Sequence, residues 1–257
     1  MFDANLWAAN PGQPTLAPGE IHVWRANLDF ESASLRALET TLAPAEQSRA
    51  DRFRFPQDRS AFIATRGILR ELLGKYVSRA PAELVFDYGD RGKPSLHASS
   101  DQSIQFNVSR SHDLALLAFA PGQSVGIDVE LVRPDFASTE IAQRYFSPQE
   151  IDELKSLPPQ SLAEGFFLCW TRKEAYVKAR GEGMQIPLNS FRVSLTPGQP
   201  ARLESTDCAR WSLHSITPDP RYVGALVAEG KAALIRYWNW NAMDTAAKNQ
   251  SRSRRGI

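Results

Sequence analysis

The chain has 257 residues, of which 42% are hydrophobic and 23% are charged, and its formal net charge is +1. This composition is typical of a soluble globular protein, and the length allows one large domain or two small ones. A charge so near neutral argues against nucleic-acid binding over the whole surface, so an electrostatic partner must be recognised by a local patch.

The N-terminal residues show no basic start followed by an apolar core, so no secretory signal is predicted. No apolar run approaches the ~20 residues that span a bilayer. The two cysteines, Cys169 and Cys208, and the four scattered histidines form no metal-binding or redox spacing. We therefore expect a cytoplasmic protein that binds neither membranes nor nucleic acid.

The N-terminal part alternates between strand and helix patterns. Residues 21–28 are predicted to form a strand, and a helix is predicted to begin near Pro44, which suits its first turn. Apolar residues recur at helical spacing over 57–78, which predicts a long second helix. A short strand at 84–88 is followed by a loop rich in glycine and proline at 88–97.

Charge is unevenly distributed along the chain. Residues 46–80 hold eight basic and four acidic side chains, whereas residues 135–165 hold six acidic and two basic ones. Such runs are usually solvated faces, but the basic one is also a candidate surface for an anionic ligand or an acidic partner.

Strand patterns dominate the centre of the chain. Residues 103–120 are predicted to form two strands and residues 124–132 a third, after which helices resume at 138–146. Ser147 and Glu150 have the spacing of a capping box at the start of the next helix.

The same spacing at Ser161 and Glu164 predicts the start of a long helix that ends at about Arg180, where Gly181 stops it. The C-terminal part is then rich in strand patterns, at 210–216, 221–230 and 232–240.

The predicted fold class is therefore α+β, with two halves of similar size that each pair one long helix with several strands. The predicted division places an N-terminal half at 1–122 and a C-terminal half at 123–240. A basic tail at 241–257 follows, which we expect to be disordered.

The segment VGIDVELV, residues 125–132, places two acids on one apolar strand. Because successive side chains of a strand point to opposite faces, Asp128 and Glu130 share one face and the aliphatic residues line the other. This arrangement is either a solvated strand face or a pair of oxygen ligands for a hard divalent cation.

The long helix predicted from Ser161 to about Arg180 adds a third acid. Glu174 and Lys178 are four residues apart and share a helix face, which alone most often indicates a surface ion pair. The aromatic residues around them predict a buried helix, where such a pair is costly unless it has a further use. Asp128, Glu130 and Glu174 together suit Mg²⁺, and Lys178 suits a phosphate oxygen, so the arrangement predicts a diphosphate substrate.

Two further segments offer phosphate contacts. Arg91 and Lys93 lie in the glycine- and proline-containing segment RGKPSL, and Ser109 and Arg110 lie near the end of a predicted strand. Basic residues on loops are usually only solvated, so neither segment defines a phosphate site by itself.

Several segments, in this order and at these separations, resemble the surfactin-synthetase type of 4′-phosphopantetheinyl transferase: GKP, FNVSRS, VGIDVE and FFLCWTRKEAYVKARGEGM. RADRFRFPQDRSAFIATRGILRELLG and YVGALVAEG add to the resemblance, which covers roughly residues 40–230. The most specific feature is GIDVE followed about 45 residues later by WTRKEAYVKA.

The resemblance implies an enzyme that moves the phosphopantetheine arm of coenzyme A onto a serine of an acyl or peptidyl carrier protein. Such carriers serve fatty acid, polyketide or nonribosomal peptide synthesis. The resemblance also implies Mg²⁺ as cofactor and coenzyme A as substrate, and the architecture of two halves implies a monomer. Its two similar halves are expected to be related by a pseudo-twofold axis, with a cleft for coenzyme A between them.

By position, the resemblance assigns Mg²⁺ ligation to Asp128, Glu130 and Glu174. Lys178 would bind the diphosphate, and Glu174 would also activate the carrier serine, so these two are the expected catalytic residues. The residues expected to contact coenzyme A are Arg49, Arg91, Lys93, Asn107, Ser109, Arg110, Asp128, Glu174 and Lys178.

One position departs from the family pattern. Arg110 stands where the family normally has histidine, and His112, two residues later, is a candidate substitute. The alternatives to the transferase are a homologue that binds coenzyme A or a carrier without catalysis or with altered affinity, and another Mg²⁺-dependent phosphotransferase. The absence of a Walker-type glycine-rich loop argues against the common versions of the latter.

Overall fold

The structure is a computed structural model that describes residues 3–89, 93–97, 104–137, 139–231 and 234–241. The N-terminal half contains the elements β1 (Glu20–Asn27), α1 (Ser32–Glu39), α2 (Pro44–Ala50), α3 (Pro56–Val77), β2 (Phe86–Tyr88), β3 (Pro94–Leu96), β4 (Ile104–Ser111) and β5 (Leu114–Pro121). The C-terminal half contains β6 (Val125–Leu131), α4 (Thr139–Tyr145), α5 (Pro148–Ser156), α6 (Leu162–Arg180), β7 (Arg192–Val193), β8 (Leu203–Glu204), β9 (Trp211–Ile216), β10 (Tyr222–Glu229) and β11 (Leu234–Asn239).

The α+β class and the two similar halves are confirmed. In the first half, α3 lies between β1 and β4 in sequence, and the strands pair in the order β1-β5-β4. In the second half, α6 lies between β6 and β9, and the strands pair in the order β6-β10-β9. Because the last strand of each unit is inserted between the other two, antiparallel to both, the halves share one topology.

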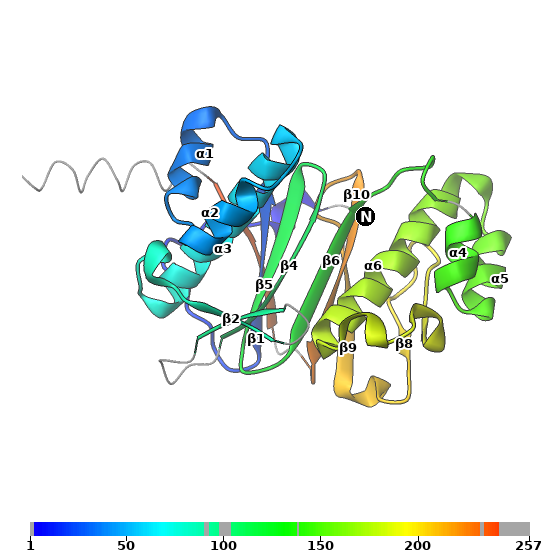
Figure 1. The fold of residues 1–257 in the computed structure, drawn as a ribbon. Coiled ribbons are helices and arrows are strands. Elements are labelled where there is room, and N and C mark those ends of the chain that lie inside the picture. The colour runs from blue at the N-terminus through cyan, green and yellow to red at the C-terminus, as the bar shows by residue number, and fades with distance from the viewer. Residues whose placement is uncertain (1–2, 90–92, 98–103, 138, 232–233, 242–257) are drawn as a thin grey trace, which may run out of the picture.

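The molecule has four layers. Helices α1–α3 cover the sheet of the first half, α6 covers the sheet of the second with α4 and α5 on its outer side, and the two sheets lie between the helix layers (Figure 1). A central core fills the space between the sheets, with Ile21, Leu116, Ile127 and Leu226 among its fully buried members. The alternation predicted for β6 is confirmed, because its aliphatic residues join this core.

The last strand returns to the first half. Strand β11 pairs in parallel with β1, from Glu20 opposite Leu234 to Arg25 opposite Asn239, and so completes a four-stranded sheet. The division at residues 122 and 123 stays a prediction, although this strand of the second range belongs to the first sheet. The predicted tail, beyond its first residue, lies outside the described residues.

Local signals placed most helix ends correctly. Pro44 opens α2, and Ser147 and Glu150 form the predicted capping box of α5. The capping box predicted at Ser161 is wrong: this residue has helical backbone angles as part of a preceding 3₁₀ turn, and its side chain makes no capping hydrogen bond. The loop predicted at 88–97 also contains the short strand β3.

Helix α6 presses directly on strand β6. A Cβ atom at Gly126 would lie 2.1 Å from the carbonyl oxygen of Ala175 and 2.3 Å from the nitrogen of Ala179, so only glycine allows this approach. At the end of α6, Gly181 takes the left-handed conformation (φ 70°) and stops the helix. The contact brings the acids of β6 next to the basic end of α6.

Candidate active site

The site lies where the edge strands β4 and β6 of the two sheets meet. Alternate side chains of β4 reach across to β6: Asn107 Oδ1 accepts a hydrogen bond from the Ile127 amide at 2.8 Å. Two residues on, Ser109 Oγ donates to Asp128 Oδ1 at 2.8 Å. The N-terminal half therefore contacts the acidic strand of the C-terminal half through side chains.

Lys178 joins the same contact from α6. Its Nζ lies 2.6 Å from Asp128 Oδ1, and it also donates to Ser109 Oγ at 3.1 Å and to the Ile127 carbonyl at 3.3 Å. The charged partner of Lys178 among the described residues is thus Asp128, on the facing strand, and not Glu174 on its own helix. This pairing of Lys178 with a strand acid was not predicted from the sequence.

The three candidate carboxylates influence one another. Burial raises the pKa of Glu130, and the charge of Asp128 raises it further against a lowering hydrogen bond from Ser111. Burial likewise raises the pKa of Glu174, and Asp128 and Glu130 add to the shift while Lys178 opposes it. The three acids therefore share this site with Lys178 and, near Glu130, with Arg133.

The donor set fits a hard cation, although the described residues contain no group of three or more acidic, histidine or cysteine side chains arranged to hold a metal. Asp128 is 4% exposed, and its Oδ2 is buried without a hydrogen-bond partner in the described part of the chain. A buried carboxylate oxygen left in this way, beside two further carboxylates of raised pKa, suits Mg²⁺, which takes oxygen ligands. Glu174 stays a prediction as the third ligand.

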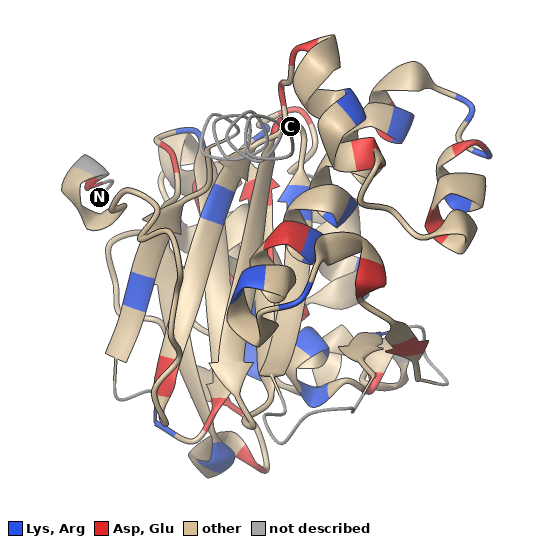
Figure 2. Cartoon of the chain, turned by 90° about the vertical axis from the view of Figure 1, so that its left-hand side faces the viewer, with Lys and Arg blue, Asp and Glu red and all other residues tan. Residues whose placement is uncertain are grey.

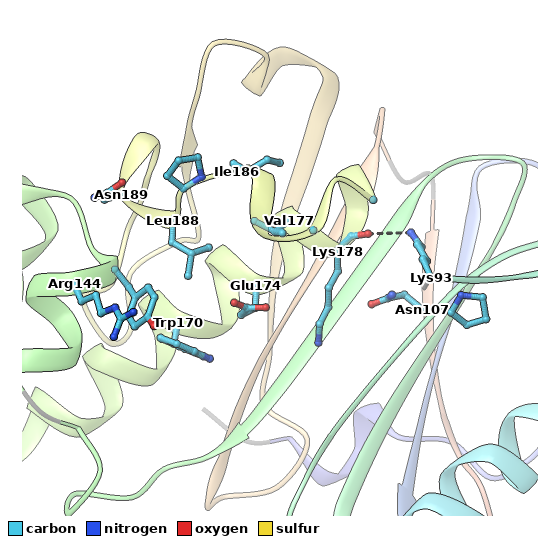
Figure 3. Close-up of a pocket in the computed structure, with 15 residues that line it drawn as sticks. Lys93, Asn107, Arg144, Trp170, Glu174, Val177, Lys178, Ile186, Leu188 and Asn189 are labelled. Carbon is cyan, nitrogen blue, oxygen red and sulfur yellow. Dashed lines mark hydrogen bonds between the residues drawn. The ribbon is translucent and has the colours of Figure 1, made fainter. Parts of the chain in front are cut away.

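A cavity of about 770 Å³ opens beside these groups. Glu174 and Lys178 line it from α6, and Lys93 and Asn107 line it from the other half (Figure 3). Its other walls are largely apolar and include Tyr145, Trp170, Ile186, Pro187 and Leu188. The cavity therefore has a charged end between the halves and a largely apolar end within the C-terminal half, which Arg144 also lines, and this suits a long substrate with an anionic group.

Lys93 crosses between the halves at the edge of this cavity. Its Nζ donates to the carbonyl oxygen of Lys178 at 2.9 Å (Figure 3). It also donates to the carbonyl oxygen of Val125 at 3.4 Å. Burial lowers the pKa of Lys93. Because the Lys178 carbonyl belongs to the last turn of α6, the ammonium caps this helix end, where a cation is favourable.

A second cavity of about 220 Å³ shares Pro94 and Asn107 with the first. Arg49 and Arg110, which are predicted to contact phosphate, line it, and Arg66 joins them. Arg66 was not predicted as a site residue; its guanidinium pairs with the buried Glu46 at 3.1 Å. Arg49 of α2 and Arg110 of β4 therefore share this cavity with Arg66, whose charge is partly neutralised by Glu46.

His112 is not brought to either of these cavities. His112 lies in the tight turn between β4 and β5, is exposed, has a φ of 51°, and lines neither cavity. The strand alternation that would place it beside Arg110 ends at Ser111. Arg91 lies outside the described residues.

A buried ion pair between α5 and α6 was not predicted from the sequence. Lys173 Nζ lies 2.8 Å from Glu150 Oε2, and neither side chain is exposed. Lys173 also donates to the carbonyls of Leu188 and Phe191, both at 2.7 Å, and so holds the segment that forms one wall of the larger cavity. Only the packing of α5 against α6 reveals this pair.

Basic residues of the 46–80 region partly neutralise neighbouring acids. Figure 2 shows Lys and Arg interspersed with Asp and Glu on the helices. Arg59 pairs with Glu39 and Asp51, and Arg70 pairs with Glu46.

The described helices include none that is both long and apolar enough to cross a membrane.

Two family models match the chain. The model described as the 4′-phosphopantetheinyl transferase superfamily matches residues 124–227, and the model described as 4′-phosphopantetheinyl transferase, N-terminal, matches residues 28–122.

Two individual relatives carry the same family name. The 4′-phosphopantetheinyl transferase HetI of Nostoc sp. is 39% identical over 237 residues, which cover 92% of this chain and 99% of that protein. The 4′-phosphopantetheinyl transferase Sfp of Bacillus subtilis is 27% identical over 73% of this chain and 82% of its own length. A solved holo-(acyl-carrier-protein) synthase from Bacillus anthracis is 20% identical, covers 42% of this chain and 96% of that chain, and gives a TM-score of 0.36.

Proposed function

Because the chain belongs to the 4′-phosphopantetheinyl transferase superfamily, we propose that it moves the phosphopantetheine arm of coenzyme A to a serine of an acyl or peptidyl carrier protein. The observation that supports this most strongly is the similarity to HetI over nearly the whole chain. The two-ended cavity between Lys178 and Trp170 agrees with it, since coenzyme A has a diphosphate and a long arm.

In the reaction, the carrier serine Oγ forms a bond to the phosphorus that bears the pantetheine arm. The bond from this phosphorus to the bridging oxygen breaks, and adenosine 3′,5′-bisphosphate leaves. The serine proton passes to the carboxylate of Glu174, the acid that lines the cavity from α6. Lys178 neutralises charge on the diphosphate oxygens.

Asp128 and Glu130 would hold Mg²⁺, with Glu174 as the third ligand. When bound, the ion supplies positive charge beside the diphosphate. Asp128 would offer its buried Oδ2, while its Oδ1 already contacts Lys178 and Ser109. Arg49 and Arg110 would hold the remaining phosphate of the nucleotide at the second cavity, and Arg91 and Lys93 stay predictions for the same ligand.

The carrier would approach the basic residues of the 46–80 region through acidic side chains around its serine. Arg59, Arg66 and Arg70 of this region are paired with acids, so the exposed Arg52 and Arg54 are the better candidates for the docking charge. We expect the apparent affinity for the carrier to fall between low and moderate salt, because exposed charges are screened.

The decisive experiment incubates several apo carrier proteins with coenzyme A, Mg²⁺ and the enzyme, followed by intact-mass analysis. We expect the carrier mass to increase by one phosphopantetheine group, and chelation of Mg²⁺ to stop the reaction. Asp128→Ala and Glu174→Gln should abolish transfer in folded protein, whereas Asp152→Ala, on the exposed side of α5, should not. Tight binding of coenzyme A without modification of any carrier would instead identify a non-catalytic homologue.

A further inference from the structure

Each acid of β6 has one oxygen held by a serine of the opposite half. Ser109 Oγ donates to Asp128 Oδ1 at 2.8 Å, and Ser111 Oγ donates to Glu130 Oε2 at 2.6 Å. Ser111 Oγ also accepts from the Leu131 amide at 3.2 Å, so its hydroxyl is fixed between two groups of β6. The two serines of β4 are two residues apart, as are the two acids of β6, so the same hydrogen bond occurs twice along the facing strands.

Both serines are buried, with 8% and 7% of their surface exposed, so water does not compete freely for these hydrogen bonds. Each bond engages a single oxygen of its acid. On Asp128 the other oxygen is buried and has no partner among the described residues. The serines thus fix the rotation of each carboxylate while leaving its second oxygen for another ligand.

We propose that Ser111, together with Ser109, is a positioning residue that orients the β6 carboxylates for the divalent cation. This inference rests on the proposed function, and it assigns to the N-terminal half a role in shaping a metal site built on the C-terminal half. A hydrogen-bonding partner that orients a ligating carboxylate commonly changes metal affinity when it is removed. Ser111 is the sharper test, because Ser109 also contacts Lys178.

The test compares Ser111→Ala with Ser111→Thr, which keeps the hydroxyl, and with Ser212→Ala. Ser212 is a partly buried strand serine that donates to the Ala228 carbonyl at 3.3 Å, away from the acids. Binding is measured with Mn²⁺ by electron paramagnetic resonance and with Mg²⁺ by calorimetry, each in the presence of coenzyme A. Thermal unfolding confirms that each variant is folded at the temperature of the titration.

We expect Ser111→Ala to weaken metal binding at least about 10-fold, while Ser111→Thr and Ser212→Ala stay near the parent protein. The cation concentration that gives half-maximal transfer should rise in parallel, with little change in the Michaelis constant for coenzyme A. Equal metal affinity of Ser111→Ala and Ser212→Ala would overturn the inference, as would equal losses for Ser111→Ala and Ser111→Thr. Failure of the parent protein to bind metal or modify a carrier would instead reject the proposed function.

Discussion

The fully buried ammonium of Lys173 allows a quantitative test of how the site is supported. Lys173→Met keeps most of the side-chain volume but removes the charge and the donors to Glu150, Leu188 and Phe191. The carboxylate of Glu150, which also accepts from the amides of Ser147 and Val193, then stays buried without its counter-charge. Removing one partner of a buried pair costs about 3–5 kcal/mol.

For a chain of this size, about 2–4 °C is lost per kcal/mol, so the melting temperature should fall by about 6–20 °C. Urea unfolding followed by circular dichroism and by tryptophan fluorescence measures the free energy of unfolding. Lys155→Met is the matched control: this lysine is exposed on α5, and its loss should stay within about 0.5 kcal/mol. Because Lys173 holds the Leu188 wall of the cavity, its loss should also weaken coenzyme A binding.

Adding Glu150→Gln to Lys173→Met should recover part of the lost stability, since a neutral amide costs less to bury than a carboxylate. A loss below about 1 kcal/mol in Lys173→Met, where one-sided removal of a buried pair predicts more, would refute the reasoning. A double variant less stable than Lys173→Met would contradict it equally, because the buried charge would then not be the cause.

Three further outcomes are expected. Gly126→Ala should lower the free energy of unfolding by about 3 kcal/mol or more, because α6 must move off β6, whereas Gly89→Ala, with no atom closer than 4.0 Å, should cost far less in the same urea assay. Burial raises the pKa of Asp207, but hydrogen bonds from Tyr176, Trp211 and Ser205 lower it to about 2. The contribution of Asp207 to stability is therefore present above the unfolded pKa of 3.8 and is lost as the pH falls toward 2. Asp207→Asn should lower the free energy of unfolding by up to about 2 kcal/mol at pH 7 and by less at pH 2.5, measured by unfolding at both pH values. Arg110→Ala should raise the Michaelis constant for coenzyme A more than it lowers kcat, and a rise with His112→Ala instead would show that the turn histidine does this work.

The elements that sequence reasoning predicted well are those specified by local signals. Pro44 and the Ser147 capping box mark helix starts through contacts within one turn, and the two-residue alternation at 125–132 marks a strand with one buried face. The capping box expected at Ser161 and Glu164 does not form, because a preceding 3₁₀ turn already holds Ser161 in helical geometry.

The parts of the site that sequence reasoning missed depend on how the halves approach each other. Ser111 acquires its role only because β4 meets β6, and Lys93 caps α6 only because its loop reaches the other half. Lys178 is four residues from Glu174, a spacing that favours pairing within the helix, yet Asp128 on the facing strand is its partner. The two-residue spacing of Ser109 and Ser111, which matches that of Asp128 and Glu130, would have been the signal for the role of Ser111.

The parallel pairing of β11 with β1 affects how the protein is made. The partners of Glu20 and Arg25 lie more than 200 positions later in the chain, so this edge of the first sheet cannot pair with β11 until those later residues have left the ribosome. An open strand edge is a template for pairing with other chains. Premature termination anywhere before Leu234 would therefore yield a product prone to aggregate, even where the remaining residues include every predicted catalytic group.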